Sequence, residues 1–283
     1  MSVMYLLVGN IGLGKSLIAR KLAWRGCVVV NHDALQVTMD GGEYGWYDSD
    51  KRNVYHACED GIIRAALLNG MDVVIDRTLI SKRVRSRFIE LAVEYKAEVI
   101  CYDFGRGDSE GLERRLKEPR GMSVSTWNGV YDRMKGQYES PVSSEGIQEV
   151  CVPPSCYVSH KFDFDGTLVI NAFPDIGKLI TEGVAWELDQ MDCVLRIRTL
   201  WEDFSNIIII ESNRSGNYEM QMREFLIRER IPYDAINENP VFDTGSRKVF
   251  ATYNYDDRNV PIYRNPDAVF EKPRITTVSS IET

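Results

Sequence analysis

The sequence predicts an α/β protein with two domains, each built on a parallel sheet. Apolar runs of strand length alternate with periodic stretches of helix length in the first half, an order typical of a parallel sheet covered by helices. The second half restarts this alternation after a segment rich in Pro and Ser. The length of 283 residues also suits two domains of ordinary size.

The elements of the first half can be assigned in chain order. Each expected strand is a short apolar run, and each expected helix has apolar residues at helical spacing. The expected strands are 4–8, 27–30, 72–75 and 98–102, and the expected helices are 17–24, 51–68 and 82–95.

The domain boundary is expected within 141–155, which contains Pro153 and Pro154 and shows no periodicity. We therefore predict a first domain over 1–140, a linker over 141–155 and a second domain over 156–283. The strands expected in the second domain are 156–164, 206–211 and 251–255.

Composition excludes several classes of protein. The net charge of −8 and the pI near 5.1 argue against a surface that coats nucleic acid broadly, although the more neutral first half could grip a nucleic-acid end. Six cysteines without a CxxC pair, and only three histidines, argue against a zinc cluster or a disulfide scaffold. No secretory signal and no apolar run of membrane-spanning length are present, so we expect a cytoplasmic protein with no membrane partner.

The strongest motif is a phosphate-binding loop with the pattern Gly, four free positions, Gly-Lys-Ser, placed between an apolar run and a helical stretch. Gly9, Gly12 and Gly14 let the backbone curl so that successive N–H groups face phosphate oxygens. Lys15 is expected to reach the β- and γ-phosphates of ATP, and the Ser16 hydroxyl is expected to hold Mg²⁺. A glycine-rich turn without a ligand is the alternative.

Two carboxylates follow expected strands of the same half. Asp33 comes after the second strand, where ligands gather in a parallel sheet, and could accept a hydroxyl proton. Its alternative role is that of a helix N-cap. Asp76 ends the third strand and is expected to help hold Mg²⁺, with a strand-end turn residue as the alternative.

Two basic segments differ in what they predict. Residues 113–121 are basic and end in a break, which is typical of a lid whose arginine covers the transferring phosphate. Arg120, between a proline and a glycine, is the expected lid arginine, whereas Arg114 and Lys117 suit a solvated helix face. The cluster 82–87 is interpreted as a solvated face, with contact to an acceptor backbone as the alternative.

A second motif, Asp163-Phe-Asp165-Gly-Thr167, stands at the expected end of a strand near the middle of the chain. Alternation along a strand places the carboxylates of Asp163 and Asp165 on the same side. One can attack phosphorus while the other moves a proton, and Mg²⁺ offsets the repulsion between carboxylate and phosphate.

The motifs of both halves together resemble the bifunctional bacteriophage polynucleotide kinase–3′-phosphatase family. The resemblance covers most of the chain and extends to domain order and length. The residues that carry it are 9–16, 31–33, 76–78 and 120–121, ahead of the Asp-x-Asp-Gly-Thr motif.

The resemblance implies a P-loop kinase that moves the γ-phosphate of ATP to 5′-hydroxyl ends of DNA or RNA. Lys15 and Ser16 would bind phosphate and metal, Asp33 would be the general base, and Arg120 the lid arginine. A homo-tetramer is implied by the likeness alone. The chain departs from the family at Gln36, where an arginine would hold the acceptor's 3′-phosphate. A neutral amide binds phosphate more weakly than a fork-shaped cation.

The second half is similar to the haloacid-dehalogenase-type phosphatases, which have a Rossmannoid fold. The short spacing between its first two motifs leaves no room for a large cap. The resemblance implies that Asp163 is the nucleophile and Asp165 the general acid and base. It assigns the phosphoryl contacts, the charge-compensating lysine and the rest of the Mg²⁺ site to Ser212, Arg214, Lys248, Asp256 and Asp257.

These inferences predict an end-healing enzyme that phosphorylates 5′-hydroxyl ends and removes 3′-phosphates. A first alternative keeps both reactions but takes a modified base or a small metabolite as acceptor, because of Gln36 and the acidic second half. A second alternative is a nucleotide-switched binding protein with an inactive second domain.

Overall fold

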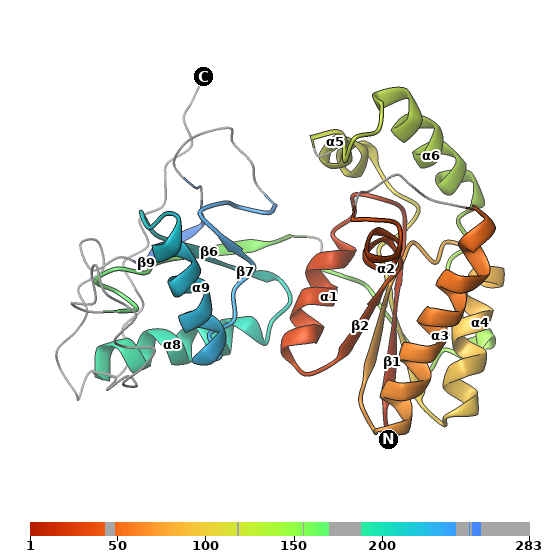
Figure 1. The fold of residues 1–283 in the computed structure, drawn as a ribbon, viewed down its shortest axis with the longest axis horizontal. Coiled ribbons are helices and arrows are strands. Elements are labelled where there is room, and N and C mark those ends of the chain that lie inside the picture. The colour runs from red at the N-terminus through yellow and green to blue at the C-terminus, as the bar shows by residue number, and fades with distance from the viewer. Residues whose placement is uncertain are drawn as a thin grey trace. The chain divides into compact units, whose positions relative to one another are not determined.

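The computed structural model describes residues 1–42, 49–117, 119–154, 156–169, 188–241, 249 and 251–255. The chain divides into two compact units, Met1–Pro153 and Pro154–Thr283, each with its own parallel sheet (Figure 1).

The first unit is built on five parallel strands in the order β2-β3-β1-β4-β5. The central position of β1 explains its sequence, because a strand covered on both faces needs an almost continuous apolar run. The strands are β1 (Val3–Val8), β2 (Val28–Asn31), β3 (Val73–Asp76), β4 (Glu98–Asp103) and β5 (Glu149–Cys151).

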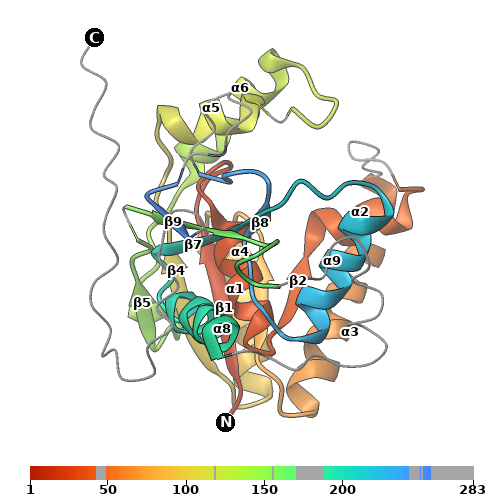
Figure 2. The ribbon, with the colours of Figure 1, turned by 90° about the vertical axis from the view of Figure 1, so that its left-hand side faces the viewer.

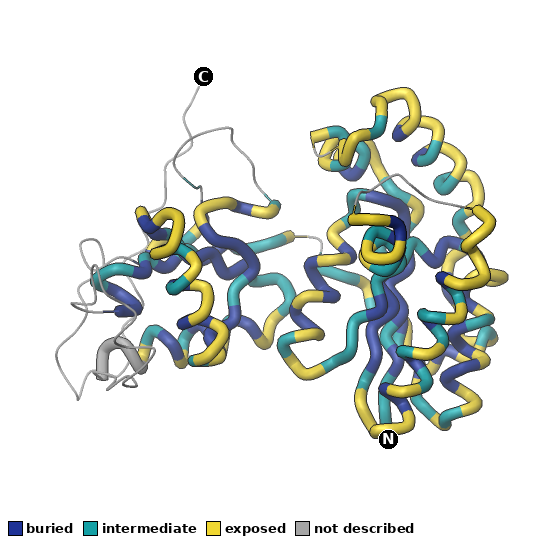
Figure 3. The backbone as a smooth tube through the Cα atoms, viewed as in Figure 1, coloured by how far each residue is buried: buried dark blue, intermediate teal, exposed yellow. Residues whose placement is uncertain are grey.

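Helices cover both faces of this sheet and one end of it. Helix α1 lies on one face and α3 and α4 on the other, while α5 and α6 lie beyond the carboxyl ends of the strands (Figure 1 and Figure 2). Figure 3 shows buried strands between more exposed helices. The helices are α1 (Lys15–Trp24), α2 (His32–Met39), α3 (Arg52–Leu68), α4 (Lys82–Glu94), α5 (Ser109–Lys117) and α6 (Val124–Gln137), with short 3₁₀ turns at Ser49–Lys51 and Ser143–Glu145.

The segment 141–153, which we expected to be part of a linker, belongs to the first unit. Its strand β5 pairs with β4, and the amide of Gln148 donates to the carbonyl of Val99. The strand has only three residues and lies at the sheet edge, so it carries no apolar alternation that sequence inspection could detect.

The interpretation of the cluster 82–87 as a solvated face is wrong at Arg85 and at Arg87, and Arg87 is partly buried against Glu59 and Asp60. Arg85 is fully buried and donates from Nε and Nη2 to the Glu145 carboxylate, at 2.8 and 2.7 Å. Its Nη1 donates to the carbonyls of Leu79 and Glu139, at 3.0 and 2.9 Å. Arg85 therefore fastens α4 to the segment that leads into β5.

The substitution Arg85→Met is expected to lower the free energy of unfolding by about 3 to 5 kcal/mol, because it leaves the Glu145 carboxylate buried without its partner. The exposed Arg83 on the same helix offers a matched control, and Arg83→Met should change stability by less than about 0.5 kcal/mol. Urea denaturation measures both values. Equal effects of the two substitutions would contradict a structural role for Arg85.

The second unit has a four-stranded parallel sheet in the order β8-β7-β6-β9. All four isoleucines of β7 are buried, as their apolar run predicts, and two helices accompany the sheet within the described residues of this unit. Its elements are β6 (Val158–Asp163), α8 (Leu188–Trp201), β7 (Asn206–Glu211), α9 (Asn217–Arg228), β8 (Ala235–Ile236) and β9 (Tyr253–Tyr255). In the part of the chain that the structure describes, no helix combines the length and apolar character needed to cross a bilayer.

Candidate functional site: a phosphate-binding loop and its lid

The loop after β1 depends on its glycines. Gly9, Gly12 and Gly14 have φ values of +147°, +73° and +83°, a range that side chains disfavour. A Cβ atom on Gly12 would lie 1.8 Å from the carbonyl oxygen of Gly111, so α5 packs directly on the loop backbone. Gly14 precedes the first residue of α1, and no described side chain caps that helix, whose N-terminus can therefore attract an anion.

Lys15 is the first residue of α1, and its side chain is buried under the loop. Its Nζ atom donates to the carbonyl of Asn10. Burial and the charge of Arg115 lower the pKa of Lys15 to about 8, against the opposing influence of Asp76 and Asp33. The structure thus places both predicted carboxylates within electrostatic range of Lys15.

Nucleotide affinity is expected to fall as the pH rises through about 8, because Lys15 then loses the proton that a triphosphate needs. The decrease should approach tenfold per pH unit, since nucleotide binding favours the protonated lysine. The affinity for a non-hydrolysable ATP analogue is measured by titration at pH values from about 7 to about 10. This range includes both the lowered pKa of Lys15 and the ordinary pKa of a lysine. Lys15→Met, which cannot titrate, should show weak affinity without this slope, and a slope in that variant would contradict the assignment.

Asn31 bonds to Asp76 and caps the helix that carries Asp33. Its Nδ2 donates to Oδ2 of Asp76 at 2.7 Å, and its Oδ1 accepts from the amide of Ala34 at 2.8 Å. Asn31, not Asp33, is therefore the N-cap of α2, which removes that alternative for Asp33. The Asp33 carboxylate is 47% exposed and stands at the helix N-terminus without a capping task.

The expected lid is formed by α5 and α6. Arg120, whose φ is +49°, places Nη1 3.5 Å from Oδ2 of Asp33. Arg114, which we expected on a solvated face, donates from Nε to the carbonyl of Gly12 at 2.9 Å. Arg115 lies over the Trp127 ring, 5.0 Å from its centroid. Arg114 thus contacts the loop and Arg120 approaches the carboxylate, and only Arg120 was predicted there.

The segment of the expected lid shares a small core with the loop, in which Ile11 of the loop packs with Trp127 and Tyr131 of α6. Asn10, fully buried, donates to the carbonyls of Arg106 and Tyr131, at 3.0 and 3.1 Å. The loop and lid are therefore joined by both apolar and polar contacts. Sequence reasoning missed Asn10, because it occupies a free position of the loop pattern.

A cluster of two arginines and a histidine surrounds Glu59 next to the ends of β2 and β3, and sequence reasoning also missed it. The buried carboxylate accepts from Nδ1 of His32 at 2.9 Å and from Nη1 of Arg77 and of Arg87 at 2.8 Å. Burial raises the pKa of Glu59, but the hydrogen bonds from His32 and Arg87 and the charge of Arg77 outweigh it and bring the pKa to about 2. Glu59 therefore stays ionised and holds the cluster in place.

In the second unit, the loop after β7 and the Asp-x-Asp motif meet. Asp165 accepts from Oγ of Ser212 at 3.0 Å and from Nη2 of Arg214 at 2.6 Å. Asp163 ends β6, in register with Glu211 at the end of β7. These contacts bring together the predicted Asp165, Ser212 and Arg214, whereas the predicted Lys248, Asp256 and Asp257 lie outside the described residues.

The hydroxyl and carboxylate oxygens near Lys15 are of the ligand type that suits a magnesium ion. Ser16 is exposed on the first turn of α1, and Asp76 offers a carboxylate oxygen, which are ligand types that Mg²⁺ prefers. No group of three or more His, Cys, Asp or Glu side chains within the described ranges is arranged to hold a metal. The remaining ligands would come from nucleotide phosphates and water, as is usual for Mg²⁺.

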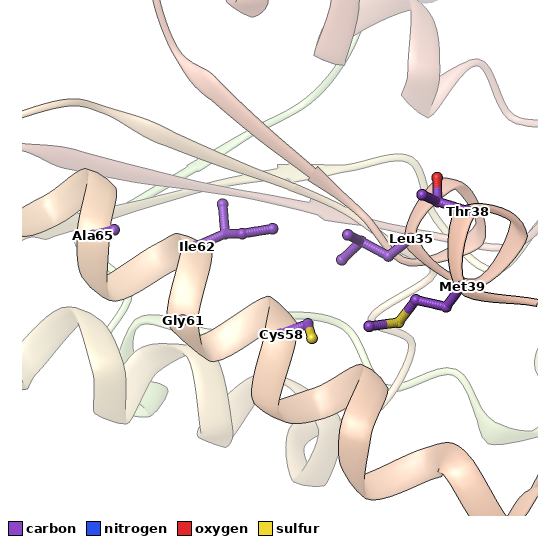
Figure 4. Close-up of a pocket in the computed structure, with 7 residues that line it drawn as sticks. All are labelled: Leu35, Thr38, Met39, Cys58, Gly61, Ile62 and Ala65. Carbon is purple, nitrogen blue, oxygen red and sulfur yellow. The ribbon is translucent and has the colours of Figure 1, made fainter.

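An apolar groove of ≈ 460 Å³ lies between α2 and α3 (Figure 4). Leu35 of α2 and Ile62 of α3 face one another across it, and none of the predicted site residues lines it. It is therefore separate from the phosphate-binding loop in its lining and in its chemistry. Its lining residues are Leu35, Thr38, Met39, Cys58, Gly61, Ile62 and Ala65.

Comparison with known proteins agrees with a nucleotide-binding first unit. Residues 4–141 match the family model described as an AAA domain. A search of curated proteins gives no match.

Among solved structures, the Pnkp1/Rnl/Hen1 RNA repair complex contains a chain that is 18% identical, with a TM-score of 0.40, covering 91% of this chain and 82% of that one. A fungal RNA kinase is 13% identical (TM-score 0.39; 54% of this chain, 39% of that one). An APS kinase from Mycobacterium tuberculosis is 15% identical (TM-score 0.38; 54% of this chain, 88% of that one). The loop, its lysine and the parallel sheet give the first unit a P-loop kinase-like α/β fold.

Proposed function

We propose that the chain is a nucleic-acid end-healing enzyme. Its first unit would transfer the γ-phosphate of ATP to 5′-hydroxyl ends, and its second unit would hydrolyse 3′-phosphate ends. The observation that carries the kinase is the convergence of Lys15, Asp33 and Arg120, with Arg120 Nη1 3.5 Å from Asp33 Oδ2 and Lys15 in the field of Asp33.

In the kinase reaction, the Asp33 carboxylate accepts the proton of the acceptor hydroxyl. The oxygen of that hydroxyl attacks the γ-phosphorus, and ADP leaves. Lys15 and the loop amides hold the β- and γ-phosphates. Arg120 exchanges its long contact with Asp33 for the transferring phosphoryl group, a step that lid closure permits. Bound Mg²⁺ supplies charge neutralisation of the phosphates, and Ser16 and Asp76 are the residues that would hold it.

In the phosphatase reaction, an oxygen of the Asp163 carboxylate attacks phosphorus and forms an acyl phosphate as the P–O bond to the 3′ oxygen breaks. Asp165 takes up a proton from solvent when the entering phosphate replaces it on Arg214, and it gives that proton to the leaving oxygen. It then takes a proton from the water that hydrolyses the acyl phosphate, which releases inorganic phosphate and restores the Asp163 carboxylate. The ion pair of Asp165 with Arg214 supports this assignment, because an entering phosphate competes for the guanidinium and frees the carboxylate. Lys248, Asp256 and Asp257 are proposed to complete this site.

Incubation with labelled ATP and an oligonucleotide that carries a 5′-hydroxyl and a 3′-phosphate tests both reactions at once. We expect label at the 5′ end and release of inorganic phosphate from the 3′ end. DNA and RNA versions of the oligonucleotide identify the preferred substrate. Absence of transfer, alongside transfer to a free nucleoside or sugar, would overturn the polynucleotide assignment.

A second candidate keeps the kinase but gives it a small acceptor. The observation that favours it is Gln36, which is 6% exposed and neutral, one turn after Asp33. Competition between an oligonucleotide and a mononucleotide for the acceptor site distinguishes the two candidates, because a site for polynucleotide ends favours the oligonucleotide.

A further inference from the structure

Asn237 directly follows β8 in a backbone conformation that few side chains tolerate. Its φ is +57°, and among the described non-glycine residues of the second unit only Arg230 also has a positive φ. Asparagine adopts this left-handed conformation with less strain than most residues. The backbone amide of Asn237 donates to the carbonyl of Ile210 at 2.9 Å, so the residue makes the last bond between β8 and β7 and then turns the chain.

The side chain of Asn237 reaches the residue that follows β7. Its Oδ1 accepts from the backbone amide of Ser212 at 2.8 Å. Ser212 lies just beyond the last residue of β7, where the regular bonding of the sheet has ended. The Asn237 side chain therefore supplies the acceptor that a neighbouring strand gives to an amide within a sheet.

Ser212 connects this hydrogen bond to two other residues of the proposed phosphatase site. Its Oγ donates to Oδ2 of Asp165 at 3.0 Å and accepts from the amide of Arg214 at 3.1 Å. Nη2 of Arg214 donates to Oδ1 of Asp165 at 2.6 Å. A displacement of the Ser212 backbone would therefore move both residues that are proposed to contact the phosphoryl group.

Two requirements at this position favour asparagine. The left-handed backbone suits glycine, asparagine or aspartate, and the amide of Ser212 needs an oxygen acceptor, which glycine lacks. Aspartate would meet both requirements, but it would add a negative charge to a site that already contains Asp163 and Asp165 and has to admit a phosphate. Asparagine provides the acceptor without the charge.

We propose that Asn237 is a positioning residue of the phosphatase site. It holds the backbone of Ser212 so that the Ser212 hydroxyl and the Arg214 guanidinium face the phosphoryl group. This inference rests on the proposed phosphatase function. It adds a residue at the end of β8 to the site at the ends of β6 and β7, since the carboxyl ends of neighbouring parallel strands form one edge at which ligands bind.

Two substitutions of Asn237 separate the effect of the acceptor from that of charge. Asn237→Gly suits the backbone but removes the acceptor, and we expect kcat for a 3′-phosphate oligonucleotide and for p-nitrophenyl phosphate to fall about 10- to 100-fold, the range for a misplaced contact. Asn237→Asp keeps the acceptor and adds a negative charge, so kcat should stay near the wild-type value while KM rises about 3- to 10-fold. A merely structural role would not divide kcat from KM in this way.

Arg230→Gly is the matched control, because it places glycine at the other left-handed position of this unit. Among the described residues, the contacts of Arg230 are made by its backbone, whose carbonyl accepts from Nε of Arg198. This variant should keep the wild-type kcat and KM. Thermal unfolding of both glycine variants should give a Tm close to that of the wild type, because glycine suits a left-handed backbone. Wild-type kcat in Asn237→Gly, or an equal loss of kcat in Asn237→Asp or Arg230→Gly, would show that the inference is wrong.

Hydrogen exchange at the Ser212 amide tests the positioning bond without reference to activity. Exchange should be faster in Asn237→Gly than in the wild type and in Asn237→Asp, and equal rates in all three would overturn the inference. If the wild type hydrolyses neither substrate, the proposed phosphatase function is wrong, and titration with inorganic phosphate and Mg²⁺ then decides the positioning role. Weaker phosphate binding by Asn237→Gly would support that role, and equal binding, or no binding by either protein, would overturn it.

Discussion

Replacement of Lys15 by alanine is expected to reduce phosphoryl transfer from ATP about 1000-fold or more, the range seen when a cation is removed from a developing phosphoryl charge. The structural reason is the position of Lys15, which starts α1 directly behind the three loop glycines and is buried beneath the loop. The measurement is transfer of labelled γ-phosphate to a 5′-hydroxyl oligonucleotide at saturating ATP.

The control for this variant is the exposed Lys82 at the start of α4, and Lys82→Ala should retain full transfer. Release of phosphate from a 3′-phosphate oligonucleotide should remain at the wild-type rate in Lys15→Ala, because the residues proposed for that reaction belong to the other compact unit. Loss of both activities in a folded Lys15→Ala protein would show that the two reactions do not have separate sites.

The second large effect is expected for Asp163→Asn. This change replaces the proposed nucleophile with a neutral amide, and loss of a nucleophile costs roughly 10⁴-fold or more in rate. Hydrolysis of p-nitrophenyl phosphate and of a 3′-phosphate oligonucleotide should disappear, while kinase activity stays unchanged. Such a result would also exclude a nucleotide-switched binding protein with an inactive second unit.

Glu219 provides the matched control for Asp163, because it is a carboxylate on α9 of the same unit, paired with Arg223 at the surface. Glu219→Gln should leave hydrolysis unaffected, since an exposed ion pair of this kind contributes little to stability. Persistent hydrolysis in Asp163→Asn, with Glu219→Gln unchanged, would assign the nucleophile to a different residue.

The strand and helix pattern was readable because buried parallel strands must be apolar on both faces. The expected runs correspond to β1, β2, β3 and β4, and the Gly-Lys-Ser loop begins α1 as its pattern requires. Strand β5 escaped detection because a three-residue edge strand has neither the length nor the alternation that marks a strand. The division between the two units falls between Pro153 and Pro154, within the range in which the boundary was expected.

Charged side chains were harder to assign, because their burial depends on partners that are distant in the sequence. Arg85 lies in a run of basic residues that resembles a solvated face, yet it is buried in an ion pair with Glu145, which is 60 residues away in the sequence. Arg114 had the same appearance, and its bond to Gly12 spans 102 residues. A sequence pattern records spacing along one element and contains no information on such contacts.

By itself, the sequence determined the alternating parallel architecture, the phosphate-binding loop and the identities of two aspartates beside it, because these follow from local chemistry and from the periodicity of buried elements. Only the tertiary structure decided that Asn31 caps α2 in place of Asp33, that Arg120 approaches Asp33, and that Glu59 gathers Arg77 and Arg87 beside them. The physical reason is that ion pairs and hydrogen bonds between separate elements depend on distances in space, which sheet order and helix packing set.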